Sequence, residues 1–293
     1  MKKYNNDVEL PILDSRLISP TLVNDIPKIY NIKIVECGSY QQIYCYDKVK
    51  IKRPKKDNDN ELNLYKINLN SVNPKSNTFT LKEIEERNII RSKLSCQRIA
   101  KTNMECWKSF ITLTFEENIK DVKFANKRFQ YFVDKVRRVN KDFKYLCITE
   151  FQKRGAIHYH LLTNIECGSS IIPKRPLKHL YKPSINTYID LEYYDIKYWL
   201  DGFSSAEPIN DDPKKVIGYI SKYMTKDIDQ RLFSKHRYFY SKNLNVPKIK
   251  YIDLNNNEDY EFYIKKIQDK ELIYQNEYID KYNDIKVQFL ELQ

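Results

Sequence analysis

The segment Ala156–Leu162 constrains the fold most strongly, because it places two histidines one residue apart inside an apolar run. The chain has only four histidines in 293 residues, and composition alone would give roughly 0.04 such pairs. A short apolar run next to a turn is typical of a β-strand, and residues i and i+2 of a strand project to the same side. We therefore expect His158 and His160 to project together, so that the two imidazoles can share one metal ion.

A predicted β-hairpin places a carboxylate near these histidines. Tyr145–Phe151 and Ala156–Thr163 have the composition of strands, and Gln152–Gly155 supplies the turn between them. Two imidazoles and one carboxylate, with open positions left for phosphate oxygens, suit a divalent ion such as Mg²⁺ or Mn²⁺. We predict that the metal site points out of the core and consists of Glu150, His158 and His160. The structural alternative is a histidine pair on a half-exposed strand.

A segment with two tyrosines follows later in the chain. Asp212 is a good N-cap and Pro213 fits the first helical position, which predicts a helix that ends near Lys226. Its positions i, i+3, i+4 and i+7 form one stripe of Tyr219, Lys222, Tyr223 and Lys226. A phenol titrates at about pH 10, so attack on phosphorus needs a lysine or a cation that favours phenolate. We predict Tyr219 as first nucleophile and Tyr223 as second; the alternative is an ordinary amphipathic helix.

The charge balance suits a polyanionic partner. Lys and Arg number 51 against 39 for Asp and Glu, which gives a net charge of +12. Basic side chains recur along a predicted helix over residues 82–102, along a second one over residues 122–138, and in the turn of the hairpin. We predict DNA contacts from Arg91, Arg98, Arg137, Arg138, Lys153 and Arg154. The alternative is a solvated charged surface, because Lys is abundant throughout the chain.

Several protein classes are disfavoured by what the sequence lacks. There is no run of 18 apolar residues, and the first ten residues have no apolar signal core. The five glycines form no Gly-x-x-x-x-Gly-Lys, which argues against a fused P-loop helicase. The six cysteines form no Cys-x-x-Cys pair, so we expect buried reduced thiols in a cytoplasmic protein without a zinc knuckle.

The sequence divides into three parts. Residues 1–78 read as an arm, a β-hairpin over 28–52 and a polar linker; residues 79–250 form the main domain with a leading basic helix; residues 251–293 are a C-terminal extension. In the main domain, the strand Phe110–Phe115, a helix and the hairpin give the order β-α-β-β. We further expect a short helix near Tyr194–Leu200 and a strand over Phe203–Ile209.

In this order, the motifs resemble those of the HUH endonuclease superfamily, named for two histidines around a hydrophobic residue. Phe110–Phe115 resembles its first motif, Glu150 with the histidine pair its metal motif, and Tyr219–Tyr223 its nucleophile motif. Trp199-x-x-Gly202-Phe203 and the segment Arg237–Ser241 look like later signatures of phage replication-associated proteins. Within the superfamily, the chain resembles rolling-circle replication initiators of the phage and plasmid type.

This resemblance implies an α+β fold in which helices flank a central antiparallel sheet, related to the RNA-recognition fold. It implies Mg²⁺- or Mn²⁺-dependent nicking and joining of single-stranded or hairpin origin DNA. The 5′-phosphotyrosine intermediate would leave a 3′-OH primer. Host helicase and polymerase would be partners in the bacterial cytoplasm, and no membrane would be involved. Two other functions stay open: a His-x-His transposase acting on single-stranded DNA, and a non-catalytic nucleic-acid-binding domain.

Overall fold

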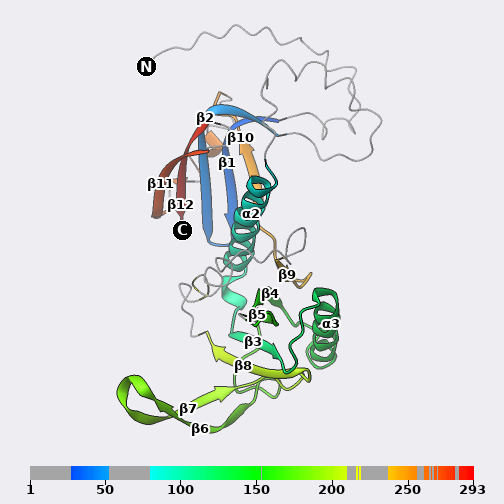
Figure 1. Ribbon diagram of the computed structural model, residues 1–293. Helices are drawn as coiled ribbons and strands as arrows, with labels where there is room; N and C mark the ends of the chain where they lie inside the picture. Colours follow the sequence, from blue (N-terminus) through cyan, green and yellow to red (C-terminus); the bar gives the residue numbers. More distant parts are fainter. Residues whose placement is uncertain are drawn as a thin grey trace.

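Two antiparallel β-sheets connected by one long helix make up the described part of the chain (Figure 1). The computed structural model describes residues 28–52, 80–152, 154–209, 216, 218, 237–255, 261–263, 265, 267–268, 270–280 and 284–293. All strand pairs in both sheets are antiparallel. The expected α+β class, with antiparallel sheets and few helices, is confirmed.

The larger sheet holds the histidine strand near its centre. Its order is β6-β7-β8-β3-β5-β4-β9, so β5 lies between β3 and β4. The predicted strands of the first motif, the hairpin and the segment after Trp199 are all present. The seven strands are β3 (Ser109–Phe115), β4 (Tyr145–Phe151), β5 (Ile157–Thr163), β6 (Lys174–Lys182), β7 (Thr187–Tyr194), β8 (Gly202–Pro208) and β9 (Tyr238–Tyr240).

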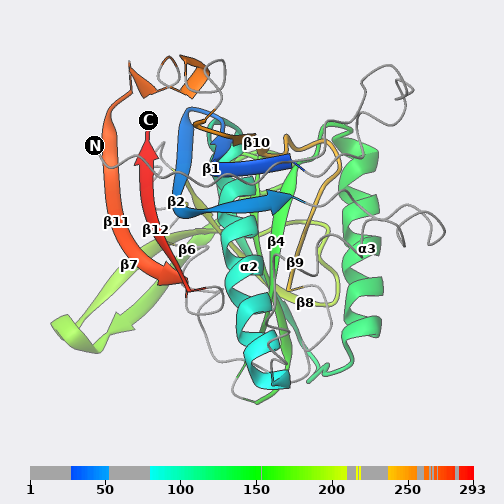
Figure 2. The same cartoon turned by 90° about the horizontal axis from the view of Figure 1, so that it is seen from above.

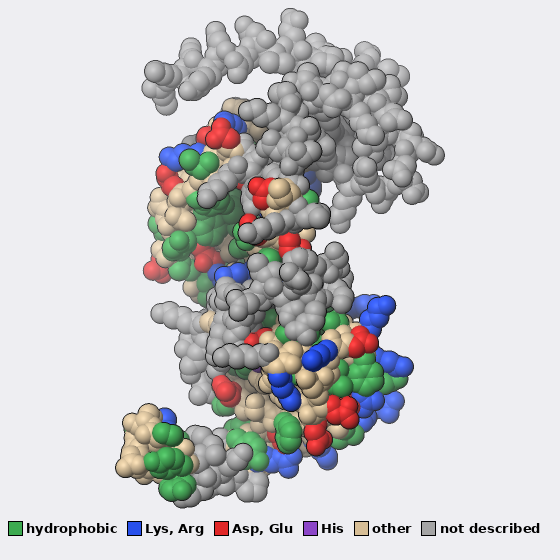
Figure 3. Space-filling view, viewed as in Figure 1, with side chains coloured by type: hydrophobic (Ala, Val, Ile, Leu, Met, Phe, Trp, Pro, Cys, Tyr) green, Lys and Arg blue, Asp and Glu red, His purple; other side chains and the backbone are tan. Residues whose placement is uncertain are grey.

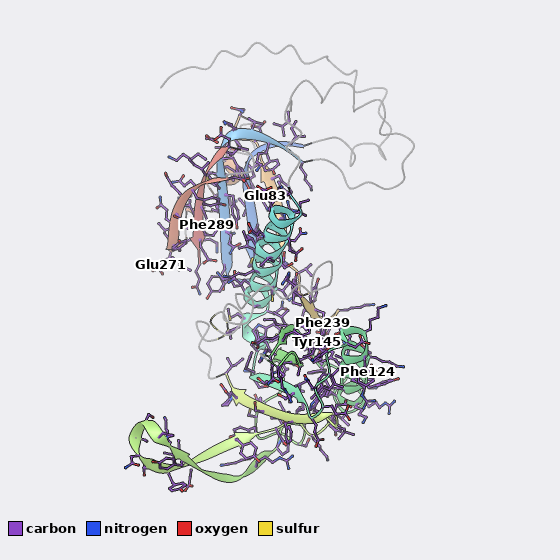
Figure 4. The ribbon with its side chains drawn as sticks, in the orientation of Figure 1. Glu83, Phe124, Tyr145, Phe239, Glu271 and Phe289 are labelled. Carbon is purple, nitrogen blue, oxygen red and sulfur yellow. The ribbon has the colours of Figure 1, made fainter. Side chains whose placement is uncertain are left out.

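Helices cover both faces of this sheet. α3 (Val122–Val139) begins at the N-cap Asp121 and packs its apolar side on the face that carries Tyr159. α2 (Leu81–Thr102) begins with a capping box of Thr80 and Glu83, and its C-terminal part packs on the opposite face. From above, β4 and β9 lie between α2 and α3 (Figure 2). A side-chain view places Tyr145 and Phe239 side by side near α3 (Figure 4), where both rings contact Phe129.

The second sheet joins segments from the two ends of the chain. Its order is β10-β1-β2-β12-β11. The N-terminal hairpin therefore pairs with strands on both sides that come after residue 247. Its five members are β1 (Lys28–Cys37), β2 (Tyr40–Lys52), β10 (Lys248–Ile252), β11 (Leu272–Asp280) and β12 (Ile285–Leu292). Division of the sequence into N- and C-terminal extensions did not reveal that the two build one sheet.

A glycine turn brings the second sheet against α2. Gly38 has φ +66°, and an added Cβ would lie 3.3 Å from the carbonyl oxygens of Lys101 and Thr102. A side chain at this position would therefore both strain the turn and crowd the end of the helix.

The prediction of a short helix near Tyr194–Leu200 is wrong. The chain instead forms a β6–β7 hairpin, with the 3₁₀ turn Pro183–Ile185 at its tip, followed by an irregular segment. The N–H of Ile196 donates to Ser204 Oγ (3.0 Å) and that of Lys197 to the carbonyl of Ile171 (3.0 Å). These donors are used by other segments rather than by an i−4 carbonyl, so tertiary bonding replaces the local helix. A second 3₁₀ turn, Met104–Cys106, precedes β3.

Candidate catalytic site

The strand registers gather the predicted metal ligands on one face of the larger sheet. Glu150 of β4 lies directly opposite His158 of β5, and Thr112 of β3 lies opposite His160. The predicted hairpin turn is present, because the N–H of Gln152 donates to the carbonyl of Ala156 (2.8 Å). Since side chains alternate along a strand, Glu150, His158 and His160 share the face opposite α3.

His160 contacts partners on both neighbouring strands. Its Nε2 lies 2.5 Å from Oε2 of Glu150, and its Nδ1 lies 3.1 Å from Oγ1 of Thr112. The ring also stacks on Phe110, with centroids 5.9 Å apart and planes 9° apart. A hydroxyl can donate to or accept from Nδ1, so Thr112 can hold this ring in either tautomer while Nε2 faces the carboxylate.

Both histidines are buried, which corrects the expectation that they point out of the core. His158 is 9% exposed and His160 is 4% exposed. Apolar neighbours on the same face pack against Cys96 and Ile99 of α2, and this packing accounts for the burial. Every residue of β5 is buried, so neither face of that strand is open to solvent.

Metal binding has partial support from this geometry. Glu150 and His160 bring one carboxylate and one imidazole into contact, a donor pair suited to a divalent ion. The ring centroid of His158 is 6.2 Å from that of His160. In the described residues, no three His, Cys, Asp or Glu side chains are grouped closely enough to hold one ion. The third ligand is therefore not in place beside the other two.

The predicted tyrosine stripe lies outside the described residues, as do Lys222, Lys226 and Lys153. Tyr219 and Tyr223 therefore have no position relative to the histidines. Val216 is described, and it is buried in the apolar cluster that contains Phe110 and Ile148 on the histidine face. The chain thus reaches this face three residues before Tyr219.

The chain returns to the same region at Arg237. The carbonyl of Arg237 accepts from the N–H of Thr149 (3.1 Å), next to Glu150. Its guanidinium lies 2.5 Å from Oε1 of Glu85 on α2, and both side chains are largely buried. This ion pair ties α2 to the start of β9, beside the Glu150 strand.

The Trp199-x-x-Gly202-Phe203 motif holds the end of β3 in place. Trp199 Nε1 donates to the carbonyl of Thr114 (3.0 Å), and Thr114 lies opposite His158. An added Cβ on Gly202 would lie only 2.3 Å from the backbone N of Glu116. Only glycine allows this close approach, so the motif positions the strand beside the histidines rather than supplying a reactive group.

The predicted DNA-contacting arginines lie in different places. Arg137 and Arg138 are in the last turn of α3, on the opposite face of the sheet from Glu150. Lys and Arg side chains are conspicuous along the α3 edge of the larger-sheet domain (Figure 3). Arg154 is exposed at the hairpin turn and donates to Gln152 Oε1 (2.7 Å). Arg91 and Arg98 lie instead between α2 and the second sheet.

Thr112, Phe110 and the Glu85–Arg237 pair were not predicted as site residues. A signal for Thr112 and Phe110 was present, because both alternate along the first motif. The register of that motif against the histidine strand was needed to place them beside His160. The Glu85–Arg237 pair joins positions far apart in the sequence and gave no local signal.

Comparisons with known proteins point in one direction. Residues 108–228 match the family model for replication-associated proteins of the ORF2 type. The match covers less than half of the chain, but it includes every predicted metal ligand and both tyrosines. The chain is also 28% identical over 130 residues to "Phasyl DNA replicon protein arp" of Escherichia coli, covering 42% of this chain and 44% of that protein. The chain thus spans less than half of this relative. No solved structure matches. None of the described helices is long and apolar enough to cross a membrane.

Proposed function

We propose that this protein is a rolling-circle replication initiator that nicks and joins single-stranded origin DNA. The observation that carries the proposal is the contact between Glu150 and His160, on the sheet face where Val216 packs. The likeness to replication-associated proteins supports the role in replication over the same residues. The HUH chemistry, the metal and the tyrosine nucleophile belong to the proposal.

The proposed first step is attack by the phenolic oxygen of Tyr219 on a backbone phosphorus. The bond from phosphorus to the 3′ oxygen breaks, and that oxygen leaves as a 3′-OH after it takes up a proton. The 5′ phosphate stays linked to the tyrosine. Lys222 would favour the phenolate and Lys226 would steady charge on the phosphoryl oxygens. Tyr223 is proposed to attack in the second transfer, which closes the displaced strand.

Glu150 and His160 are proposed to hold a divalent ion, Mg²⁺ or Mn²⁺, with His158 turned toward them as third ligand. Thr112 would accept from Nδ1–H of His160 and fix the ring while Nε2 faces the ion. When bound, such an ion supplies Lewis-acid polarisation of the scissile phosphate. The burial of both histidines restricts water at this face and strengthens electrostatic interactions there.

A non-catalytic nucleic-acid-binding domain is the second candidate. The direct contact of Glu150 with the buried His160 favours it, because a purely structural pair would have the same geometry. A single-stranded DNA transposase would share the first candidate's chemistry and differ in the DNA that it joins.

The test is cleavage of a labelled hairpin oligonucleotide drawn from a randomised single-stranded pool, with and without Mn²⁺. An initiator or transposase gives metal-dependent cleavage with a covalent protein–DNA adduct. Glu150→Gln should reduce cleavage, while Arg138→Gln on the far face of the sheet serves as control. Binding of DNA without cleavage under any metal condition would favour the non-catalytic domain.

A further inference from the structure

A pocket separate from the Glu150–His160 face lies between α2 and the second sheet. β1, β2, β11 and β12 form its floor and α2 forms one wall. In Figure 1, this region is above the larger sheet, where α2 runs beside the second sheet. The described residues that line it are Lys33, Tyr44, Tyr46, Lys50, Arg91, Leu94, Ser95, Arg98, Tyr278, Asp280 and Val287.

Positive charge in this pocket is poorly neutralised by the protein. Four described lining residues are cations, namely Lys33, Lys50, Arg91 and Arg98, against one carboxylate, Asp280. The guanidinium of Arg98 donates to neutral acceptors, Oε1 of Gln42 (2.8 Å) and Oη of Tyr44 (2.7 Å). Burial, Arg98 and Lys50 together lower the pKa of Lys33 to about 8. Like charges held this closely are stabilised by an anion.

Aromatic rings stand beside these cations. The ammonium of Lys50 lies 4.4 Å from the ring centroid of Tyr46, and that of Lys33 lies 5.5 Å from Tyr44. Tyr278 lines the pocket from β11 and keeps 42% of its surface exposed. Phe289 lies on the same sheet (Figure 4) and packs against Tyr44. An exposed ring at the edge of a cationic pocket can stack with an unpaired base.

We propose that this pocket is a second, non-catalytic binding site for single-stranded DNA. Its cations would contact backbone phosphates, and Tyr278 would stack on a base. The need for an unpaired base is the reason for choosing a single strand over a duplex. The inference rests on the proposed function only in taking DNA as the ligand. α2 lines this pocket with Arg91 and Arg98 and contributes Cys96 and Ile99 to the packing on the Glu150 face. The helix therefore borders both sites.

The test is equilibrium binding of a fluorescent oligothymidine, which cannot pair with itself, to the full chain at several salt concentrations. The double variant Lys33→Gln, Lys50→Gln should bind more weakly and lower the salt slope by about 0.7 for each phosphate that the lysines no longer neutralise. Tyr278→Leu should weaken binding by at least about fivefold. The matched control, Lys123→Gln with Lys127→Gln, removes two exposed charges on α3 and should leave binding unchanged.

Three further measurements give the proposal definite outcomes. Thermal unfolding confirms that each variant is folded, and Lys33→Arg, which keeps the charge, should retain binding. A blunt duplex should bind more weakly than the oligothymidine, and inorganic phosphate should compete only weakly. Equal binding of the duplex, or loss of binding in the α3 control to the same degree as in the pocket variant, would overturn the inference. So would unchanged affinity of the pocket variant and Tyr278→Leu.

Failure of this inference differs from failure of the proposed function. Covalent adduct formation at saturating oligonucleotide concentration reports on the Glu150–His160 face and should persist in the pocket variants. Adduct formation by wild type with unaltered binding in the pocket variants would reject the pocket alone. Weakened binding in the pocket variants without any adduct from wild type would reject the nicking function alone.

Discussion

Oε2 of Glu150 lies 2.5 Å from Nε2 of His160, across the pairing of β4 and β5. This contact couples the two residues, so replacement of either one changes the environment of the other. It also means that metal binding competes with a contact already present in the protein. Both consequences can be measured separately.

His160→Ala should lower the free energy of unfolding by about 2–4 kcal/mol, because it leaves a cavity beside Phe110 and takes a partner from Glu150. Glu150→Gln keeps an acceptor for Nε2–H and should cost less, within about 1 kcal/mol. Urea unfolding followed by circular dichroism measures both. Equal stability of His160→Ala and wild type would mean that the ring is not packed as described.

Metal affinity should depend on the same residues. The double variant His158→Gln, His160→Gln keeps polar side chains of similar volume but removes the imidazole ligands. Calorimetric titration with Mn²⁺ should then show no binding at this face, while Glu150→Gln should weaken affinity less completely. Unchanged Mn²⁺ affinity in the double histidine variant would remove the metal assignment.

Gly202→Ala should destabilise the fold by more than about 2 kcal/mol, because the added Cβ would collide with backbone atoms of β3. Gly218→Ala is the matched control, since that glycine is helical and a Cβ there meets nothing within 4 Å. The control should be neutral or stabilising by up to about 1 kcal/mol. Thermal unfolding compares them, and a tolerated Gly202→Ala would refute the steric account.

DNA affinity should depend on the protonation of Lys33. The folded pKa of about 8 lies below the ordinary value of 10.5, so without DNA the fold gains stability as pH rises between these values. A phosphate favours the protonated amine, so DNA affinity should fall as pH rises through 8. The groups that face or surround Lys33 are Arg91, Arg98, Tyr44, Tyr46, Lys50, Tyr251, Tyr278 and Asp280.

Anisotropy titrations at pH 7 and pH 9 measure this dependence, with Lys33→Gln as the comparison. The variant should lose the part of the pH dependence centred near 8. An identical pH profile in wild type and Lys33→Gln would show that Lys33 does not meet the phosphate.

Local patterns predicted the parts of the site that neighbouring residues determine. The β4–β5 hairpin needs only a turn between two strand-like runs, and its register brings Glu150 opposite His158. The spacing of the two histidines then fixed their common face. Burial of the pair was not predictable in this way, because it depends on packing against α2, which comes from a separate part of the sequence.

Long-range pairing accounts for most of what the sequence did not predict. β2 pairs with β12, for example Gln42 with Glu291, and no local signal links such distant positions. The cationic pocket follows from that pairing, since Lys33 and Tyr278 lie on strands from opposite ends of the chain. The predicted short helix failed for the same reason, because Ile196 and Lys197 bond to other segments.

The most direct test of the central claim is mass spectrometry of the peptide trapped on single-stranded DNA in the presence of Mn²⁺. The account predicts that the 5′ end of the cleaved strand is linked to the peptide that contains Tyr219. It also predicts that Tyr219→Phe abolishes this adduct without weakening DNA binding, while Tyr223→Phe still cleaves but fails in the second transfer. An adduct on Tyr223 that survives in Tyr219→Phe would reverse the two roles. An adduct that persists in the double Phe variant would contradict the mechanism.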